Sequence, residues 1–306
     1  MKLYPRHFST VVHNCNISGI PLSRYFLDIE IVLNECTEEE IIRKMENNLR
    51  VMENAAAGGM AGVRSFSGLT GGDAARLDAY RAKGSPFGGS LYLEAMISAL
   101  AVNEVNASMG VICATPTAGS SGILPGVLLA IRNRLNLSRR AQLDFLITAG
   151  GAGILIGNQA SLSGAEGGCQ AEVGSASAMT AAAIVEAAGG TPAQSGHALA
   201  IALKNILGLT CDPVASLVEV PCIKRNAIGV VNAIAAAEMA LAGIESRIPA
   251  DEVIQAMGSI GRMMPMALRE TALGGLAQTP TARRMTKMLK EEGHILWPFP
   301  ASGGDD

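Results

Sequence analysis

The chain has 306 residues, which is enough for one large domain or two and for a sizeable buried core. Charged residues make up only 17% of it, against about 25% in an average domain. We therefore expect another subunit to cover part of the surface, which predicts an oligomer. The formal net charge of -3 excludes the basic surface that nucleic-acid binding needs, so no nucleic-acid partner is expected.

We expect a cytoplasmic protein without a membrane segment. Residues 1–16 contain His, Arg, Asn and Pro where a secretory signal would need an apolar run. The six cysteines show no pairing pattern, which is typical of a reducing compartment. One uncharged segment, residues 145–165, is long enough to span a bilayer. It is rich in glycine, however, and we interpret 150–153 as a turn or a close-packing element instead.

In chain order, the first strong element begins at a capping box, Thr37-Glu38-Glu39-Glu40. Apolar residues then recur at helical spacing, and we expect this helix to run to about Ala57 and to stop at Gly58-Gly59. Further helices are expected over 91–109, 177–188 and 228–242, and one beginning near residue 251. Few segments alternate with a period of two residues, so strands are a minority. The sequence predicts a mostly α fold with helices packed closely through alanine and glycine.

The domain organisation predicted from this pattern is simple. Residues 1–36 form an N-terminal extension, residues 37–297 form one helical domain, and residues 298–306 form a loose C-terminal tail. No internal repeat and no low-complexity linker indicates a further boundary.

Two glycine-rich segments, 67–73 and 115–122, mix glycines with hydroxyl side chains. Glycine lets the backbone approach a ligand closely, and hydroxyls add hydrogen-bond donors, so such loops can bind an anion. A plain turn is an equally good interpretation of either loop alone. Neither matches the phosphate-binding loop of nucleoside triphosphatases. The candidate substrate-binding residues in these loops are Ser67, Gly68, Thr70, Gly71, Asp73, Thr117, Gly119, Ser120 and Ser121.

Three polar residues, Lys224, Arg225 and Asn226, extend this candidate set. They come shortly after Cys222, separated from it only by Ile223. A guanidinium group such as that of Arg225 can hold a carboxylate through two hydrogen bonds. A solvated charge pair is the competing interpretation.

Cys169, Cys211 and Cys222 lie in polar or proline-interrupted contexts in the half of the chain that has the fewest charges. Thiolates favour zinc, copper(I) or iron–sulfur clusters. A closed structural site normally has four ligands, so three cysteines suggest an open coordination position at which chemistry can occur. The chain has no Cys-x-x-Cys pair, so a simple core role stays open for them. A core role is what we expect for the other three, Cys15, Cys36 and Cys113.

Five segments taken together resemble one family, the α chain of the bacterial iron–sulfur-dependent L-serine dehydratases. The resemblance extends over about residues 37–285. Its motifs are Ser-Gly-Leu-Thr-Gly-Gly-Asp at 67–73, Asn-Glu-Val-Asn-Ala at 103–107, Cys-Ala-Thr-Pro-Thr-Ala-Gly at 113–119, Gly-Cys-Gln-Ala-Glu at 168–172, and Cys-Asp-Pro at 211–213 with Val-Pro-Cys-Ile-Lys-Arg-Asn at 220–226.

This resemblance implies a compact helical catalytic domain that converts L-serine to pyruvate and ammonia. It implies a [4Fe-4S] cluster on Cys169, Cys211 and Cys222, with an iron acting as Lewis acid and no pyridoxal phosphate. Family members also have a β portion with a Ser-Ser-Ser-His-Thr stretch, which this chain lacks. A β chain is therefore expected as a partner, and the general base is left unassigned.

Two other functions stay open at the level of the sequence. The first is a related cluster-dependent lyase, such as an L-cysteine desulfidase. The second is a non-catalytic iron–sulfur or ligand-binding module.

Overall fold

Helices provide nearly all the regular structure in residues 4–84 and 86–294, the part of the chain that this computed structural model describes. Within these residues no strand forms, and extended pairing is limited to two isolated bridges, Arg64 with Gly71 and Cys211 with Arg269. The expected mostly α fold is confirmed. None of the described helices combines the length and the apolar character needed to cross a membrane.

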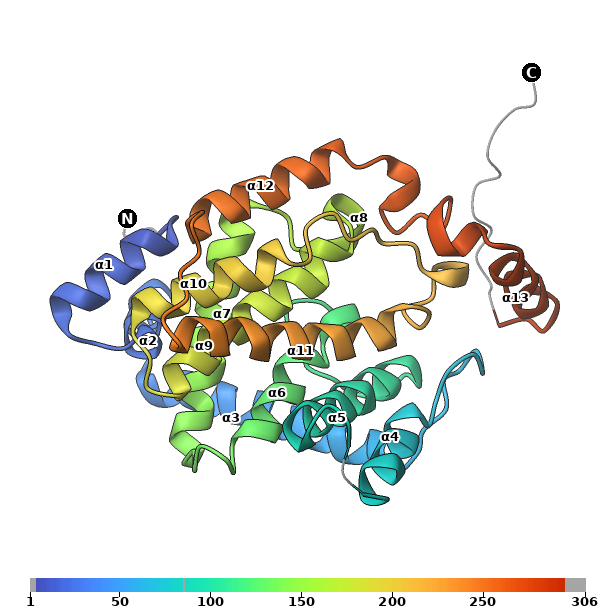
Figure 1. Ribbon diagram of the computed structural model, residues 1–306, viewed down its shortest axis with the longest axis horizontal. Helices are drawn as coiled ribbons and strands as arrows, with labels where there is room; N and C mark the ends of the chain where they lie inside the picture. Colours follow the sequence, from blue (N-terminus) through green and yellow to red (C-terminus); the bar gives the residue numbers. More distant parts are fainter. Residues whose placement is uncertain (1–3, 85, 295–306) are drawn as a thin grey trace.

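The α-helices pack into an elongated body, with α1 and α2 at one end and α13 at the other (Figure 1). Their bounds are α1 Phe8–Ser18, α2 Leu22–Leu33, α3 Glu38–Met60, α4 Asp73–Ala82, α5 Ser90–Ala107, α6 Ile123–Ile131, α7 Arg139–Gln159, α8 Gly164–Gly167, α9 Ser175–Ala187, α10 Pro192–Lys204, α11 Cys222–Leu241, α12 Ala250–Met263 and α13 Pro280–Glu291. The shorter turns are η1 Ala118–Ser120, η2 Gln170–Gly174, η3 Val214–Ser216, η4 Met266–Leu268 and η5 Gly275–Gln278.

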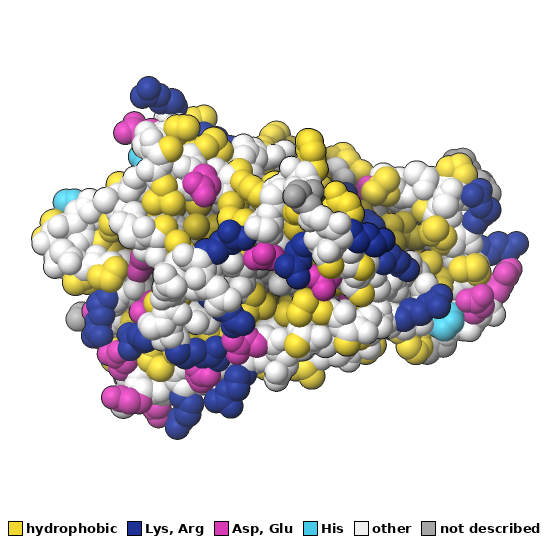
Figure 2. Space-filling view, turned by 60° about the horizontal axis from the view of Figure 1, so that its bottom comes forward, with side chains coloured by type: hydrophobic (Ala, Val, Ile, Leu, Met, Phe, Trp, Pro, Cys, Tyr) yellow, Lys and Arg dark blue, Asp and Glu magenta, His cyan; other side chains and the backbone are white. Residues whose placement is uncertain are grey.

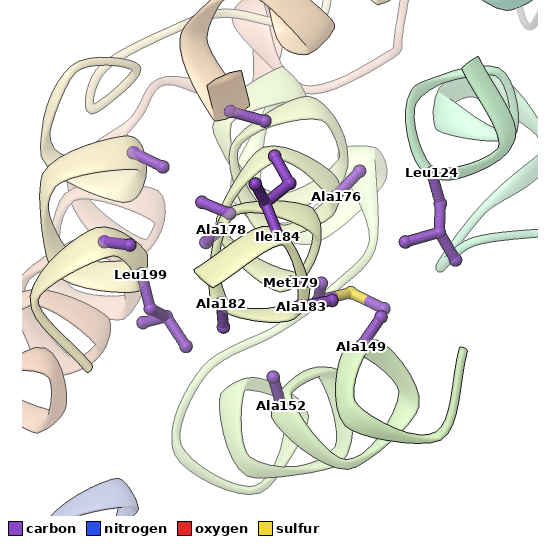
Figure 3. Packing of buried hydrophobic residues seen from close by; sticks show 14 of the residues in the cluster. Leu124, Ala149, Ala152, Ala176, Ala178, Met179, Ala182, Ala183, Ile184 and Leu199 are labelled. Carbon is purple, nitrogen blue, oxygen red and sulfur yellow. The ribbon is translucent and has the colours of Figure 1, made fainter. Parts of the chain in front are cut away.

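Helix α9 is the centre of the core. Every residue from Ser175 to Val185 is buried, and α7, α10 and α11 pack around it. A helix that is apolar or small on all sides must be enclosed by its neighbours. Figure 3 shows the alanines of α9 beside Ala149 and Ala152 of α7, where small side chains let the two helices approach closely.

Helix α3 begins as the sequence predicts and ends later. Thr37 accepts a hydrogen bond from the Glu40 amide (3.2 Å), and Glu40 accepts one from the Thr37 amide (2.9 Å), so the capping box is confirmed. The helix does not stop at Gly58 and Gly59 but continues to Met60. A Cβ atom at position 59 would collide with the backbone of α5 at Ala101. Gly59 thus permits close helix packing and does not end the helix.

The two adjacent glycines should respond to alanine in opposite directions. Gly59→Ala is expected to lower the free energy of unfolding by about 2 kcal/mol or more, because rigid backbone must move to admit the methyl group. At position 58 the nearest atom to an added Cβ is the Val105 side chain, at an ordinary 3.7 Å. Gly58→Ala should therefore stabilise α3 by about 0.5–1 kcal/mol, through the lower backbone entropy of alanine. Urea unfolding of both variants measures the difference, and equal effects would contradict the packing role of Gly59.

The glycine-rich segment 150–153 lies inside α7. A Cβ at Gly151 would collide with the Phe26 ring of α2, and one at Gly153 would lie 2.7 Å from Cε of Met179. The close-packing interpretation is confirmed, and the alternative of a turn is wrong. This part of α7 is buried against other helices of the same chain.

Residues before Thr37 contribute to this core. Phe8 of α1 and Phe26 of α2 are 1% exposed, so both helices pack as the others do. The Asp251 carboxylate accepts hydrogen bonds from the first amides of α1, including that of Phe8 at 2.7 Å. Glu186 of α9 likewise accepts a hydrogen bond from the backbone amide of Ser23 in α2. The packing is continuous across the boundary predicted at residue 36. The expected tail, 298–306, lies outside the described residues.

The other four predicted helices agree with the structure to within a few residues at their starts, with one exception. α5, α9 and α12 begin at Ser90, Ser175 and Ala250, close to their predicted starts. Helix α11 begins at Cys222, six residues before the predicted start at 228. This earlier start places Cys222 and the three polar residues after it in the first turn of α11.

Candidate metal and substrate site

Two of the three predicted cysteine ligands meet in the structure, together with a carboxylate. The ligand atoms of Cys169, Glu172 and Cys211 all lie within 4.8 Å of one another, and all three residues are buried. We call these residues the Cys–Glu group. Cys222 is also buried, at 6% exposure, but is not part of this 4.8 Å group. Cys169 and Glu172 come from the segment that follows α8, and Cys211 comes from the connection between α10 and α11; Figure 1 shows the course of both segments.

Local backbone geometry explains how these residues converge. The π-helical turn η2 follows Cys169 and carries Glu172, so both come from one short segment. Cys211 is fixed from the other side, because its amide donates to the Leu268 carbonyl (2.9 Å) and its carbonyl accepts from the Glu270 amide (2.7 Å). A Cβ at Gly164 would lie 2.5 Å from Oε2 of Glu172. A larger residue than glycine at that position would therefore clash with the group.

The two thiols of the group shift each other's pKa. A hydrogen bond from Cys211 lowers the pKa of Cys169, and the same hydrogen bond, with burial, raises the pKa of Cys211. Burial raises the pKa of Cys222, and the charges of Cys169 and Glu172 raise it further. Cys222 is thus within electrostatic range of the group. Burial also raises the pKa of Glu172.

Arg225 extends from the first turn of α11 toward the Cys–Glu group. Its guanidinium donates to Asp212 and to the Thr210 carbonyl, both at 2.8 Å. The side chains of Arg225 and Asp212 are only 12% and 6% exposed, so this is a buried ion pair and not a solvated one. Burial would lower the pKa of Arg225, but the charge of Cys169 and the hydrogen bond to it raise the pKa. A cation held here stabilises the thiolate form of Cys169.

The second glycine-rich loop borders the Cys–Glu group. The Thr117 hydroxyl donates to Oε1 of Glu172 at 2.7 Å and lies 3.1 Å from Oγ of Ser120. A Cβ at Gly119 would lie 3.3 Å from the same Glu172 oxygen, so the loop backbone passes close to the carboxylate. Ser121 instead donates to the Ala118 carbonyl within the loop itself (2.8 Å). The structure thus brings Thr117 and Gly119 to the group, with Ser120 beside Thr117.

Asn226 holds this loop in place. Its side-chain nitrogen donates to the carbonyls of Gly119 (2.7 Å) and Cys222 (2.9 Å), and its oxygen accepts from the Gly122 amide (3.1 Å). The residue is fully buried. Its side-chain amide therefore forms hydrogen bonds with backbone groups in this structure. The substrate contact expected from the sequence stays a prediction.

The first glycine-rich loop, 67–73, lies beside a cavity. Asp73 pairs with Arg76 (2.6 Å) and with the exposed Lys224 (2.8 Å). Gly68 and Gly71 have positive φ angles of 74° and 137°, which favour glycine. The adjoining cavity, of about 430 Å³, is lined by every predicted substrate residue of this loop except Ser67, and by three cations, Arg64, Arg76 and Lys224.

Two buried carboxylates at the site were not identified from the sequence. Glu172 contacts the cysteines, and Glu219 accepts hydrogen bonds from Ser67 and Thr70, both at 2.7 Å. Glu172 lies three residues after Cys169 and Glu219 three before Cys222, and these spacings were the only signal available.

Comparison with known proteins agrees with this geometry. The family model described as "Serine dehydratase alpha chain" matches residues 15–277. A protein of Bacillus subtilis named "Probable L-serine dehydratase, alpha chain" is 59% identical over 270 residues, which is 88% of this chain and 90% of the relative. The "L-serine dehydratase, alpha chain" of Peptoniphilus asaccharolyticus is 45% identical over 92% of this chain and 97% of its own. An "L-serine dehydratase" of Mycobacterium bovis is 50% identical over 58% of this chain but only 40% of its own length. On these matches, the chain belongs to the serine dehydratase alpha chain family.

Proposed function

We propose that this chain is the α chain of an L-serine dehydratase, a lyase that converts L-serine to pyruvate and ammonia. The observation that carries the proposal is the buried Cys–Glu group. A cavity lined by cations adjoins the 67–73 loop, and one of these cations, Lys224, lies in the first turn of α11 after Cys222. The names of the relatives, which specify L-serine and an alpha chain, support the same reaction.

The donor set fits an iron–sulfur cluster. Cysteine thiolates are the usual ligands of such clusters, and Cys169 is held toward the thiolate form by its hydrogen bond with Cys211 and by Arg225. Cys222 is the first residue of α11, and its buried thiol would lose its proton on binding the metal. We propose that Cys169, Cys211 and Cys222 hold a [4Fe-4S] cluster. When bound, this cluster would supply a Lewis acid that makes the serine hydroxyl a better leaving group.

The residues of this chain would bind and orient the substrate. The cations beside the 67–73 loop, which include Arg76 and Lys224, would attract the serine carboxylate. The 115–122 loop would border the reacting end, because Thr117 donates to Glu172 and Ser120 lies beside Thr117. Loss of the α-proton and of the hydroxyl group gives aminoacrylate, which tautomerises and hydrolyses to pyruvate and ammonia. The proposed reaction requires no pyridoxal phosphate.

We further propose that a β chain completes the assembly and that it works in the cytoplasm. Large hydrophobic side chains lie exposed close to the substrate loop, including Phe66 (67%) and Met109 (82%). The Phe66 amide donates to the Ala107 carbonyl, which places the two segments side by side. On the face shown in Figure 2, hydrophobic side chains lie between charged ones over much of the surface. A partner that covers such surface is what the low charge content leads us to expect.

Anaerobic reconstitution tests the proposal. The α chain is combined with its β chain, iron and sulfide, and pyruvate release from L-serine is compared with sulfide release from L-cysteine. We expect pyruvate formation that depends on iron and is lost in air, because an iron without a protein ligand is open to oxidants. Preferential sulfide release would identify a desulfidase instead. Full serine turnover in air without bound iron would exclude the cluster mechanism, and a cluster spectrum indifferent to L-serine would indicate a non-catalytic module.

A further inference from the structure

Glu219 is a buried carboxylate that the proposed reaction does not yet use. It is 5% exposed and lies between η3 and α11. Its two oxygens accept hydrogen bonds from Ser67 and Thr70, which are 152 and 149 residues distant in the chain, each at 2.7 Å. One residue thus holds both hydroxyl-bearing positions of the first glycine-rich loop.

The hydroxyl groups of Ser67 and Thr70 can each donate only one hydrogen bond. Each hydroxyl has one proton, and an ionised carboxylate can only accept. While Ser67 and Thr70 donate to Glu219, neither can donate to a substrate carboxylate. The Ser67 oxygen also accepts from the Leu69 amide at 3.1 Å, so it is engaged on both sides. Serine would therefore find its carboxylate partners among the cations of the adjoining cavity, not at these two hydroxyls.

The main chain of Glu219 connects to the cysteine segment. Its carbonyl accepts from the Ile223 amide at 3.0 Å, in the first turn of α11, which begins at Cys222. The side chain of Leu69 in the loop packs in one apolar cluster with Val214 and Val220, on either side of Glu219 in the sequence. The loop and the start of α11 are thus joined by the buried Glu219 and the apolar contacts around it, in addition to the exposed ion pair of Asp73 with Lys224.

We propose that Glu219 is a positioning residue that fixes the 67–73 loop against the Cys222 end of α11 and thereby sets the geometry of the substrate site. This inference rests on the proposed function, since the substrate is taken to be L-serine. Glu219 acts through Ser67 and Thr70 and does not itself touch the substrate.

The test uses the reconstituted holoenzyme with the variants Glu219→Gln, Glu219→Ala, Thr70→Val and the double variant Glu219→Gln/Thr70→Val. Glu219→Gln keeps one acceptor oxygen, so it should raise KM for L-serine about tenfold, and Glu219→Ala should raise it roughly a hundredfold. The kcat value and the iron content should change much less. In the double variant, Thr70→Val should add little to the effect of Glu219→Gln, because both remove the same interaction. Glu245→Gln, at an exposed carboxylate, is the matched control and should behave as the wild type.

Amide hydrogen exchange of the same variants gives a readout independent of turnover. Exchange over residues 67–73 should rise in Glu219→Gln and in Thr70→Val but not in Glu245→Gln. Unchanged exchange there, an unchanged KM, or independent effects of the two single changes would overturn the proposal. A wild-type holoenzyme that forms no pyruvate would refute the proposed function instead, while the exchange result would still decide whether Glu219 anchors the loop. If Glu219→Ala does not fold, the Thr70→Val and Glu219→Gln variants still test whether Glu219 positions the loop.

Discussion

Replacing Cys169 or Cys211 by serine is expected to abolish iron binding and serine turnover together. The two thiols lie within one 4.8 Å group, and a serine hydroxyl is a poor substitute for a soft thiolate ligand. Cys222→Ser should have the same effect, because we propose Cys222 as the third ligand of the cluster. Iron and sulfide analysis with the cluster spectrum of each purified variant measures this, beside a pyruvate assay.

The other three cysteines provide matched controls. Cys15 is 1% exposed within the main helical core, so Cys15→Ala should cost some stability and leave the iron content unchanged. Cys36 and Cys113 are half-buried, and alanine at either position should likewise retain the cluster. Equal loss of iron from all six variants would contradict the assignment of the ligands.

Local signals in the sequence were sufficient where the structure depends on near neighbours. The capping box at Thr37 predicts the start of α3 correctly, because both of its hydrogen bonds join residues three apart. Glycine was less informative. Gly58-Gly59 was expected to end a helix, and 150–153 could equally have been a turn, yet both lie inside helices. Whether a glycine ends a helix or admits a neighbour depends on the partner helix, which the sequence pattern does not specify.

In the candidate site, too, the residues with a local sequence pattern were predicted, and those that depend on distant contacts were not. The polar and proline-interrupted contexts of the three cysteines, and then the resemblance, indicated them as ligands, and the structure brings Cys169 and Cys211 together. Glu172 and Glu219 were missed, because a glutamate in an apolar segment has no distinctive local pattern. Their importance comes from hydrogen bonds to Thr117 and Ser67, which are 55 and 152 residues distant in the chain. Asn226, expected at the substrate, is instead bonded to backbone carbonyls and an amide of the neighbouring loop.

Glu172→Ala is expected to lower kcat/KM for L-serine roughly ten- to a hundredfold, since a hydrogen bond to a charged group contributes about 1.5–3 kcal/mol. The carboxylate accepts from Thr117 at 2.7 Å and lies 3.8 Å from the Cys211 sulfur. Its removal leaves a buried hydroxyl without that partner and takes a negative charge away from the cysteines. Kinetics of the anaerobically reconstituted variant, with iron and sulfide analysis, measure the effect.

Two further variants separate the charge of Glu172 from its hydrogen bond. Glu172→Gln keeps the shape and an acceptor for Thr117 but removes the charge, whereas Thr117→Val removes the hydrogen bond and keeps the carboxylate. If the charge beside Cys211 matters, Glu172→Gln should resemble Glu172→Ala, and Thr117→Val should be the mildest of the three. If Thr117→Val is as severe as Glu172→Ala, the carboxylate acts mainly by holding the 115–122 loop. Wild-type kinetics and iron content in all three variants would mean that Glu172 takes no part in the site, and the group would then consist of the cysteines alone.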